Sequence, residues 1–193
     1  GGLAADMPIA PLSDASPEYD RPRTTPVAPP VVDITSVAEE LAPLEALKKL
    51  IACPDLASKR WVWEQYDHMV MSDTIRRPGG DAAVVRIHGT NRGLAITTDC
   101  TPRYCEADPR KGGAQAVAEV WRNLTSVGAR PLAVTDCLNF GSPERAHVMG
   151  QFAGCIQGIG DACRALNFPV VSGNVSFYNE TESTTIQPTP EIG

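Results

Sequence analysis

The sequence lacks the patterns that mark nucleic-acid binding, secretion or membrane insertion. Its 193 residues carry a formal net charge of −6 and contain no block of basic residues, so we expect no broad electrostatic binding to nucleic acid. The first residues, GGLAAD, have no basic segment and no apolar run, which predicts that no secretory signal is present. No stretch is long and apolar enough for a membrane span, and we therefore expect a cytoplasmic location.

Metal-binding and nucleophile patterns are missing too. The three histidines are scattered, and the six cysteines match neither a CxxC zinc pair nor a dense disulfide framework. Cys100 and Cys105 have no histidine or second cysteine pair nearby, while Cys155 and Cys163 lie in an apolar stretch where buried thiols are common. There is no Walker A loop, no GxGxxG after a strand and no Ser-His-Asp arrangement. These features indicate a reducing compartment and leave no self-contained catalytic motif.

Three segments are predicted along the chain, and the first is set apart by its proline content. Residues 1–34 contain seven prolines, which remove backbone donors and fix φ, so this segment is predicted to be an extended linker. Residues 35–66 are predicted to be a helical lead-in, with short helices over 36–42 and 44–52 and a third within 55–66. The remaining residues, 67–193, are predicted to form the folded domain.

Alternating strand and helix patterns run through that domain. The expected order is β-β-α-β-α-β, which predicts an α/β or α+β fold with helices covering one face of a mixed sheet. The first two strands are predicted to form an antiparallel hairpin. The expected elements are strands at 82–87 and 94–98, a helix at 113–127, a strand at 131–135, a helix at 144–166 and a strand at 168–172.

Glycine recurs at every fourth position of the second long helix, as Gly150, Gly154 and Gly158. In a domain outside a membrane this spacing predicts a close approach of the helix to a sheet, at some loss of helix propensity. The pair Gly112 and Gly113 before the first helix resembles a weak anion site, although a helix start without a ligand is the commoner case.

Two strand ends carry groups that suit a ligand. Asp136 follows the strand at 131–135, and its carboxylate needs a backbone cap, an ion or a ligand hydroxyl, with a helix cap slightly favoured. After the strand at 168–172, Gly173 permits close backbone approach, Asn174 offers an amide oxygen to a hard cation, and Ser176 can donate to a phosphate. The alternative is an Asn-stabilised turn in which Ser176 bonds its own backbone. Asp99 is a third candidate and also a common turn residue.

Longer motifs resemble one known family. The strings WEQYDHMVMSDT (63–74), TDCLNFGSPE (135–144) and SGNVSFYNET (172–181) are similar to those of the synthetase subunit of phosphoribosylformylglycinamidine synthase, and close similarity extends over roughly 60–193. This enzyme is also called formylglycinamide ribonucleotide amidotransferase and acts in purine biosynthesis. The resemblance implies the amino-terminal domain of the second half of a two-half chain, preceded by its linker. It also implies an aminoimidazole ribonucleotide synthetase-like fold whose sheet pairs with the first half in a shared barrel.

The resemblance further implies an ATP-dependent carbon–nitrogen ligase that converts formylglycinamide ribonucleotide and glutamine-derived ammonia to the amidine, with Mg²⁺ as cofactor. Its partners would be a glutaminase subunit, a small bridging subunit and the first-half domain. By matching motif positions, Asp136 and Gly173 would contact ATP, Asn174 would bind magnesium and Ser176 would contact the substrate, all on one pocket rim. The family's catalytic histidine belongs to the first half, so this chain is expected to be inactive alone and to self-associate. Another synthetase of the superfamily, or a non-catalytic nucleotide-binding or assembly domain, remains the alternative.

Overall fold

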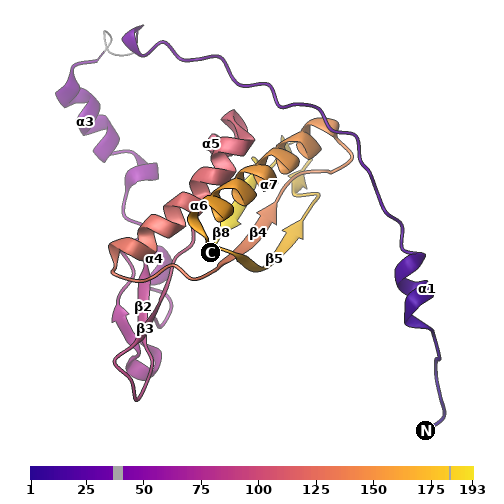
Figure 1. The fold of residues 1–193 in the computed structure, drawn as a ribbon. Coiled ribbons are helices and arrows are strands. Elements are labelled where there is room, and N and C mark those ends of the chain that lie inside the picture. Colours follow the sequence, from indigo (N-terminus) through magenta and orange to yellow (C-terminus); the bar gives the residue numbers. More distant parts are fainter. Residues whose placement is uncertain (37–40, 183) are drawn as a thin grey trace.

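The computed structural model describes residues 1–36, 41–182 and 184–193. Two long helices, α6 (Pro109–Ser126) and α7 (Ala146–Leu166), pack side by side against one face of a three-stranded sheet (Figure 1). The sheet has the order β5-β4-β8, formed by Val170–Ser176, Val134–Asn139 and Thr189–Ile192. Strands β4 and β5 are parallel, whereas β8 is antiparallel to β4, so the sheet is mixed and the predicted fold class is confirmed.

The helices and the inner sheet face enclose the hydrophobic core. Helix α6 and helix α7 each bury one apolar stripe, and β4 buries alternate residues, as expected when a strand has one covered face. Cys155 and Cys163 are buried in α7, which confirms the predicted buried thiols. The largest side chains that are almost fully buried include those of Phe140, Phe168, Ile192, Val117, Val120 and Val134.

The predicted antiparallel hairpin is confirmed. Strands β2 (Ala83–Arg86) and β3 (Gly93–Ile96) pair in register, and β1 (Thr74–Arg76) adds a third strand that the sequence analysis did not anticipate. The short helix α5 (Pro102–Ala107) leads into α6 and was also missed. A two-stranded hairpin, β6 (Glu180–Thr181) and β7 (Thr184–Thr185), connects β5 to β8.

Helix α6 begins four residues before the predicted start. Asp108 is its N-cap and accepts a hydrogen bond from the Lys111 backbone N–H at 3.1 Å, while Pro109 occupies the first helical turn. Gly112 and Gly113 therefore lie inside the helix, and the suggested anion site at its start is wrong. The end of the helix agrees with expectation, because Gly128 has φ +80° just beyond it.

The spaced glycines of α7 do not contact the sheet, which corrects the prediction. A Cβ on Gly158 would lie 1.8 Å from the Arg110 carbonyl oxygen, and one on Gly154 would lie 2.9 Å from Pro109 Cβ. A Cβ on Gly150 would lie 1.9 Å from the Thr24 carbonyl oxygen. These glycines instead let the start of α6 and the linker pack closely on α7.

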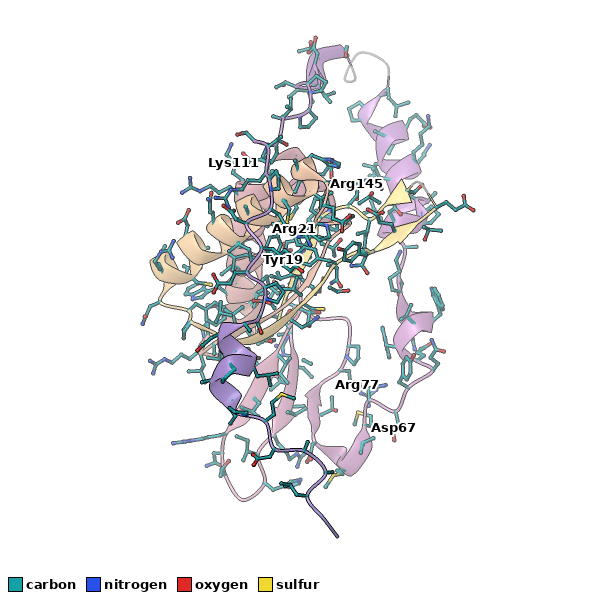
Figure 2. The ribbon with its side chains drawn as sticks, turned by 90° about the vertical axis from the view of Figure 1, so that its right-hand side faces the viewer. Tyr19, Arg21, Asp67, Arg77, Lys111 and Arg145 are labelled. Atoms are coloured by element: carbon teal, nitrogen blue, oxygen red, sulfur yellow. The ribbon has the colours of Figure 1, made fainter. Side chains whose placement is uncertain are left out.

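The linker is largely exposed, and apart from the short helix α1 (Ile9–Asp14) it is extended. It is fixed to α7 at one point, where the Thr24 N–H donates to the Ala146 carbonyl oxygen at 3.0 Å. Figure 2 looks onto this segment, where Arg21 lies over the Tyr19 ring at 4.8 Å. We call residues 23–26 the strap.

The lead-in contains α3 (Pro43–Ile51) and α4 (Arg60–Trp63), which match the helices predicted over 44–52 and within 55–66. One 3₁₀ turn, Pro54–Leu56, lies between these helices, and a second, Val70–Ser72, follows the lead-in just before β1. The helix predicted over 36–42 falls mainly on 37–40, which lie outside the described residues.

Candidate functional site

The four candidate residues lie inside two neighbouring strands and not beyond their ends. Strand β4 continues to Asn139 and β5 to Ser176, so the predicted strand ends at 135 and 172 are wrong. In the parallel ladder Asp136 is opposite Gly173, and the next pair is Cys137 with Asn174. Both strands were predicted too short because polar residues in a strand interior are typical of a turn.

Strand alternation separates the four residues into two pairs. Successive side chains of a strand point to opposite faces, so Asp136 and Gly173 face the helices, while Asn174 and Ser176 face the uncovered side. The expected single rim on one side of the sheet is therefore wrong. The roles predicted for the individual residues are not tested by this arrangement and stay predictions.

Asp136 and Gly173 form a close pair on the helix-facing side. A Cβ built on Gly173 would lie 2.2 Å from Asp136 Oδ1 and 2.6 Å from Cγ, so the carboxylate occupies the space that a side chain would need. Burial beside the helix layer raises the pKa of Asp136 above its ordinary value. Within residues 1–36, 41–182 and 184–193, no hydrogen bond to this carboxylate is found. A half-buried carboxylate without a donor is suited to accept one from a ligand.

Asp136 does not cap the following helix, although the cap was slightly favoured from the sequence. Helix α7 starts at Ala146, and its N-cap is Arg145, which makes no side-chain capping bond. Asp136 lies within β4, on the face next to α7, where its charge contributes to a raised pKa of Cys163. Burial is the main cause of the Cys163 shift.

The uncovered face of the sheet carries two rows of short polar side chains. Strand β4 presents Thr135, Cys137 and Asn139 there, and β5 presents Ser172, Asn174 and Ser176. Ser172 Oγ donates to Thr135 Oγ1 at 2.9 Å, which ties the two strands together at one end. We call these six residues the polar face. Glu191 of β8 is paired with Cys137 and adds a carboxylate to the same side.

Asn179 orders the far end of the polar face, and sequence reasoning missed it. Its side-chain amide donates to the carbonyl oxygens of Phe140 at 3.0 Å and Ser176 at 2.8 Å, and it also lies 3.3 Å from Ser176 Oγ. The predicted Asn-stabilised turn thus exists, but Asn179 makes it and not Asn174. An asparagine in the string SFYNE, directly after a strand, was the available signal.

Glu180 fixes the loop after β4 to the loop after β5. Its carboxylate accepts hydrogen bonds from the Ser142 backbone N–H at 2.9 Å and from Thr185 Oγ1 at 3.2 Å, and it pairs with Arg145 at 3.1 Å. The Ser142 bond is the main reason that the pKa of Glu180 lies below its ordinary value. Figure 2 shows Arg145 beside the β6–β7 hairpin, where it also donates to Thr185 at 2.8 Å. Both loops next to the candidate residues are therefore held in place.

Metal-binding groups are few in this arrangement. Over the described ranges, no three side chains of His, Cys, Asp or Glu lie close enough to hold a metal ion together. Asn174 is exposed on the polar face, so its amide oxygen is free to act as one ligand of a hard cation. Asp99 pairs with Ile192 through its backbone and accepts a hydrogen bond from Asn123, which makes it a structural residue here.

The described part of the chain contains no helix that is both long and apolar enough to span a bilayer.

Comparison with known proteins agrees with this architecture. The family model "AIR synthase related protein, N-terminal domain" matches residues 79–193. Over its 193 residues, the chain is 62% identical to phosphoribosylformylglycinamidine synthase subunit PurL of Bradyrhizobium sp. (strain ORS 278), and it covers 26% of the length of that protein.

Two solved structures from Thermotoga maritima are similar. PurL complexed with AMPPCP superposes with a TM-score of 0.70 at 33% identity, covering 98% of this chain and 29% of that one. PurL complexed with FGAR gives a TM-score of 0.65 at 34% identity, and the match covers 91% of this chain and 26% of that one. The chain thus spans about a quarter of the length of the relatives it matches.

Proposed function

We propose that this chain, which belongs to the family "AIR synthase related protein, N-terminal domain", is part of the synthetase subunit of phosphoribosylformylglycinamidine synthase. The observation that carries the proposal is the 62% identity to subunit PurL over the whole chain. Because the match covers only 26% of that relative, we infer that the activity belongs to a longer polypeptide. We further propose that this chain supplies the amino-terminal domain of its second half, as the resemblance of its motifs implies.

The proposed reaction is an ATP-dependent carbon–nitrogen ligation in purine biosynthesis. The γ-phosphoryl group of ATP moves to the amide oxygen of formylglycinamide ribonucleotide and ADP leaves. Ammonia, released from glutamine, then adds to the amide carbon, and phosphate leaves with the former amide oxygen to give the amidine. The glutaminase and small bridging subunits are the proposed partners, in line with the word "subunit" in the name of the relative, and the cytoplasm is the proposed location.

We assign Asp136 and Gly173 to ATP. The Asp136 carboxylate is desolvated by the helix layer, and no donor in the described ranges bonds it, so a nucleotide hydroxyl would meet no competing partner. Gly173 keeps this carboxylate in place because any larger residue would overlap it. The T. maritima relative binds the ATP analogue AMPPCP, which supports a nucleotide ligand for the family.

Asn174 is the proposed magnesium ligand and Ser176 the proposed substrate contact. Magnesium keeps several waters and takes only one or two protein oxygens beside phosphate oxygens, so a single amide oxygen fits its role. When bound, the ion would neutralise phosphate charge. Ser176 lies two residues along the same face, and Asn179 holds its hydroxyl within 3.3 Å of an amide nitrogen. This contact orients the Ser176 hydroxyl at the end of the polar face.

One ligand can reach both pairs only over the free edge of β5. This strand is the outer member of the sheet, and Val170–Val175 are exposed. Gly173 has no side chain at the point where a ligand would cross from the Asp136 side to the Asn174 side. We therefore place the nucleotide across this edge, with its phosphates toward Asn174.

The site is incomplete in this chain, which favours a second candidate function. The polar face is uncovered, and no metal-binding cluster occurs in the described ranges. Taken alone, the chain would act as a non-catalytic nucleotide-binding or assembly domain that gains activity only with the rest of the subunit. Another synthetase of the superfamily is disfavoured by the whole-length identity to PurL.

A chimera tests the proposal directly. This chain replaces the matching quarter of the Bradyrhizobium subunit, and conversion of formylglycinamide ribonucleotide, ATP and ammonium to amidine and ADP is measured. We expect activity from the chimera and none from the 193 residues alone. Asn174→Ala should raise the Mg²⁺ concentration for half-maximal rate about tenfold or more, whereas Asp14→Asn on the exposed helix α1 should change nothing. An inactive but folded chimera, or product from the isolated chain, would contradict the proposal.

A further inference from the structure

One side chain joins the carboxyl ends of the parallel strands β4 and β5. Asn179 donates from Nδ2 to the carbonyl oxygens of Phe140 and Ser176, at 3.0 and 2.8 Å. The backbone links the same residues, since the Phe140 N–H donates to the Ser176 carbonyl oxygen at 3.0 Å and the Asn179 N–H donates to the Phe140 carbonyl oxygen at 3.1 Å. These four hydrogen bonds close a cluster of Phe140, Ser176 and Asn179, which we call the strand-end clamp.

The strand-end clamp is itself held from two sides. The Asn179 carbonyl oxygen accepts a hydrogen bond at 3.0 Å from the N–H of Ile186, directly after β7. On the helix side, the Phe152 ring of α7 makes edge contacts with the rings of Phe140 and Phe177, at centroid distances of 5.2 and 5.1 Å. A side chain with neighbours fixed in this way is held in one geometry before a ligand arrives.

The orientation of the Asn179 amide follows from its partners. Carbonyl oxygens only accept hydrogen bonds, so Nδ2 must face Phe140 and Ser176, and Oδ1 occupies the other position. Nδ2 also lies 3.3 Å from Ser176 Oγ. The Ser176 hydroxyl therefore has an N–H donor next to its oxygen.

The hydrogen of the same hydroxyl has no close acceptor. Asn179 Oδ1 lies 3.5 Å from Ser176 Oγ, beyond the range of about 2.5–3.0 Å that O–H···O bonds usually have. No second acceptor for this hydrogen is found within residues 1–36, 41–182 and 184–193. A hydroxyl in this state is suited to donate to an oxygen atom of a ligand.

We infer that Asn179 is a positioning residue that makes the Ser176 hydroxyl a hydrogen-bond donor toward the substrate. The substrate atom that Ser176 meets is then an acceptor oxygen, of the phosphate, amide or formyl group, and not an N–H. Asn179 acts through Ser176 and needs no substrate contact of its own. This inference rests on the proposed function, in which Ser176 contacts formylglycinamide ribonucleotide.

A double-mutant cycle in the chimera tests the inference. The KM values for formylglycinamide ribonucleotide and for ATP are measured for the parent, Asn179→Ala, Ser176→Ala and the double variant. We expect Asn179→Ala to raise the substrate KM roughly fivefold, the effect of one hydrogen bond, and to leave the KM for ATP within about twofold. In the Ser176→Ala background the same change should have little effect on either. Asn91→Ala, in the exposed β2–β3 turn, is the matched control and should change neither KM.

Asn179→Asp tests the direction of the hydrogen bond. Its carboxylate would accept the Ser176 hydrogen and withdraw it from the substrate. The coupling of Asn179→Asp with Ser176→Ala should therefore exceed that of Asn179→Ala, and the cycle cancels the effect of the added charge. Should Asn179→Ala not fold, Asn179→Ser retains one donor and carries the same cycle.

Two results would overturn the inference alone. If Ser176→Ala raises the substrate KM but the effects of the two substitutions multiply independently, Asn179 does not act through Ser176. If Asn179→Ala raises both KM values in parallel, its role is confined to the fold. An unchanged substrate KM in Ser176→Ala would instead refute the proposed substrate contact, and the inference with it.

Discussion

The overlap between Asp136 and Gly173 predicts that the stability effect of Gly173→Ala depends on whether the Asp136 carboxylate is present. In Gly173→Ala, the new Cβ would lie 2.2 Å from Asp136 Oδ1, whereas ordinary contact begins near 3.4 Å. The carboxylate must therefore move by more than 1 Å, out of its present rotamer, which costs roughly 0.5–1.5 kcal/mol. Against this, replacing a glycine in a strand interior gains about 0.5–1 kcal/mol. The net effect of Gly173→Ala should therefore lie between a stabilisation of about 0.5 kcal/mol and a destabilisation of about 1 kcal/mol.

The same substitution should be more favourable when the carboxylate is absent. In an Asp136→Ala background the overlap disappears and only the strand gain of about 0.5–1 kcal/mol remains. The coupling energy between the two positions should then be roughly 0.5–1.5 kcal/mol, above the usual scatter of additive pairs. Urea denaturation of the wild type, both single variants and the double variant measures it. Asp136→Asn is the matched control, since the amide fills the same space and should leave the effect of Gly173→Ala unchanged.

The result that would refute this reasoning is an equal effect of Gly173→Ala in both backgrounds. That outcome would mean the carboxylate does not lie over Gly173, and the proposed ATP contact would lose its geometric basis. A destabilisation well above 1 kcal/mol in both backgrounds would instead point to backbone strain at Gly173.

Three further predictions follow from the packing, the loops and the uncovered face. Gly158→Ala should destabilise the fold by about 3 kcal/mol in urea denaturation, because its Cβ would lie 1.8 Å from the Arg110 backbone oxygen. Gly160→Ala is the control: its Cβ would meet only the movable Arg164 side chain, at 3.1 Å, so this variant should stabilise the fold by up to about 1 kcal/mol. Glu180→Gln should lower the denaturation midpoint at pH 7. Because the Ser142 hydrogen bond and Arg145 lower the pKa of Glu180, this difference should begin to shrink as the pH falls below the ordinary Glu value of about 4.3 and should be lost below the lowered pKa; a difference that does not shrink on acidification would contradict a role for the charged carboxylate. The isolated chain should self-associate through its uncovered sheet in sedimentation velocity, and Ser172→Lys on the β5 edge should weaken this association; a clean monomer at high concentration counts against it.

Much of the fold could be predicted from periodicity. Helix α7 and the β2–β3 hairpin follow from apolar spacing and turn residues, because each has a distinct solvent-facing side. Strand β8 was missed because Pro190 lies inside it and proline usually argues against a strand. It is tolerated here because its nitrogen, like the Ile192 N–H that donates to Asp99, lies on the side of β8 away from β4, so no β4–β8 hydrogen bond is lost. A pairing between residues far apart in sequence leaves no local signal.

The residues of the candidate site could be identified from the sequence, but their positions relative to one another could not. Local composition indicated Asp136 and Asn174, yet it could not reveal that their strands run on past them. Their separation onto two faces depends on the β4–β5 register, which the sequence does not encode locally. Asn179 was missed because its partners, the carbonyl oxygens of Phe140 and Ser176, come together only after folding.

The strap has a consequence for how the chain is tethered. Because Thr24 is bonded to the start of α7, the first twenty-odd residues leave the domain from its helical side. Their point of attachment therefore lies on the side of the sheet opposite the polar face. One backbone hydrogen bond, made where Thr24 packs on Gly150, thus sets the point from which the linker leaves the domain.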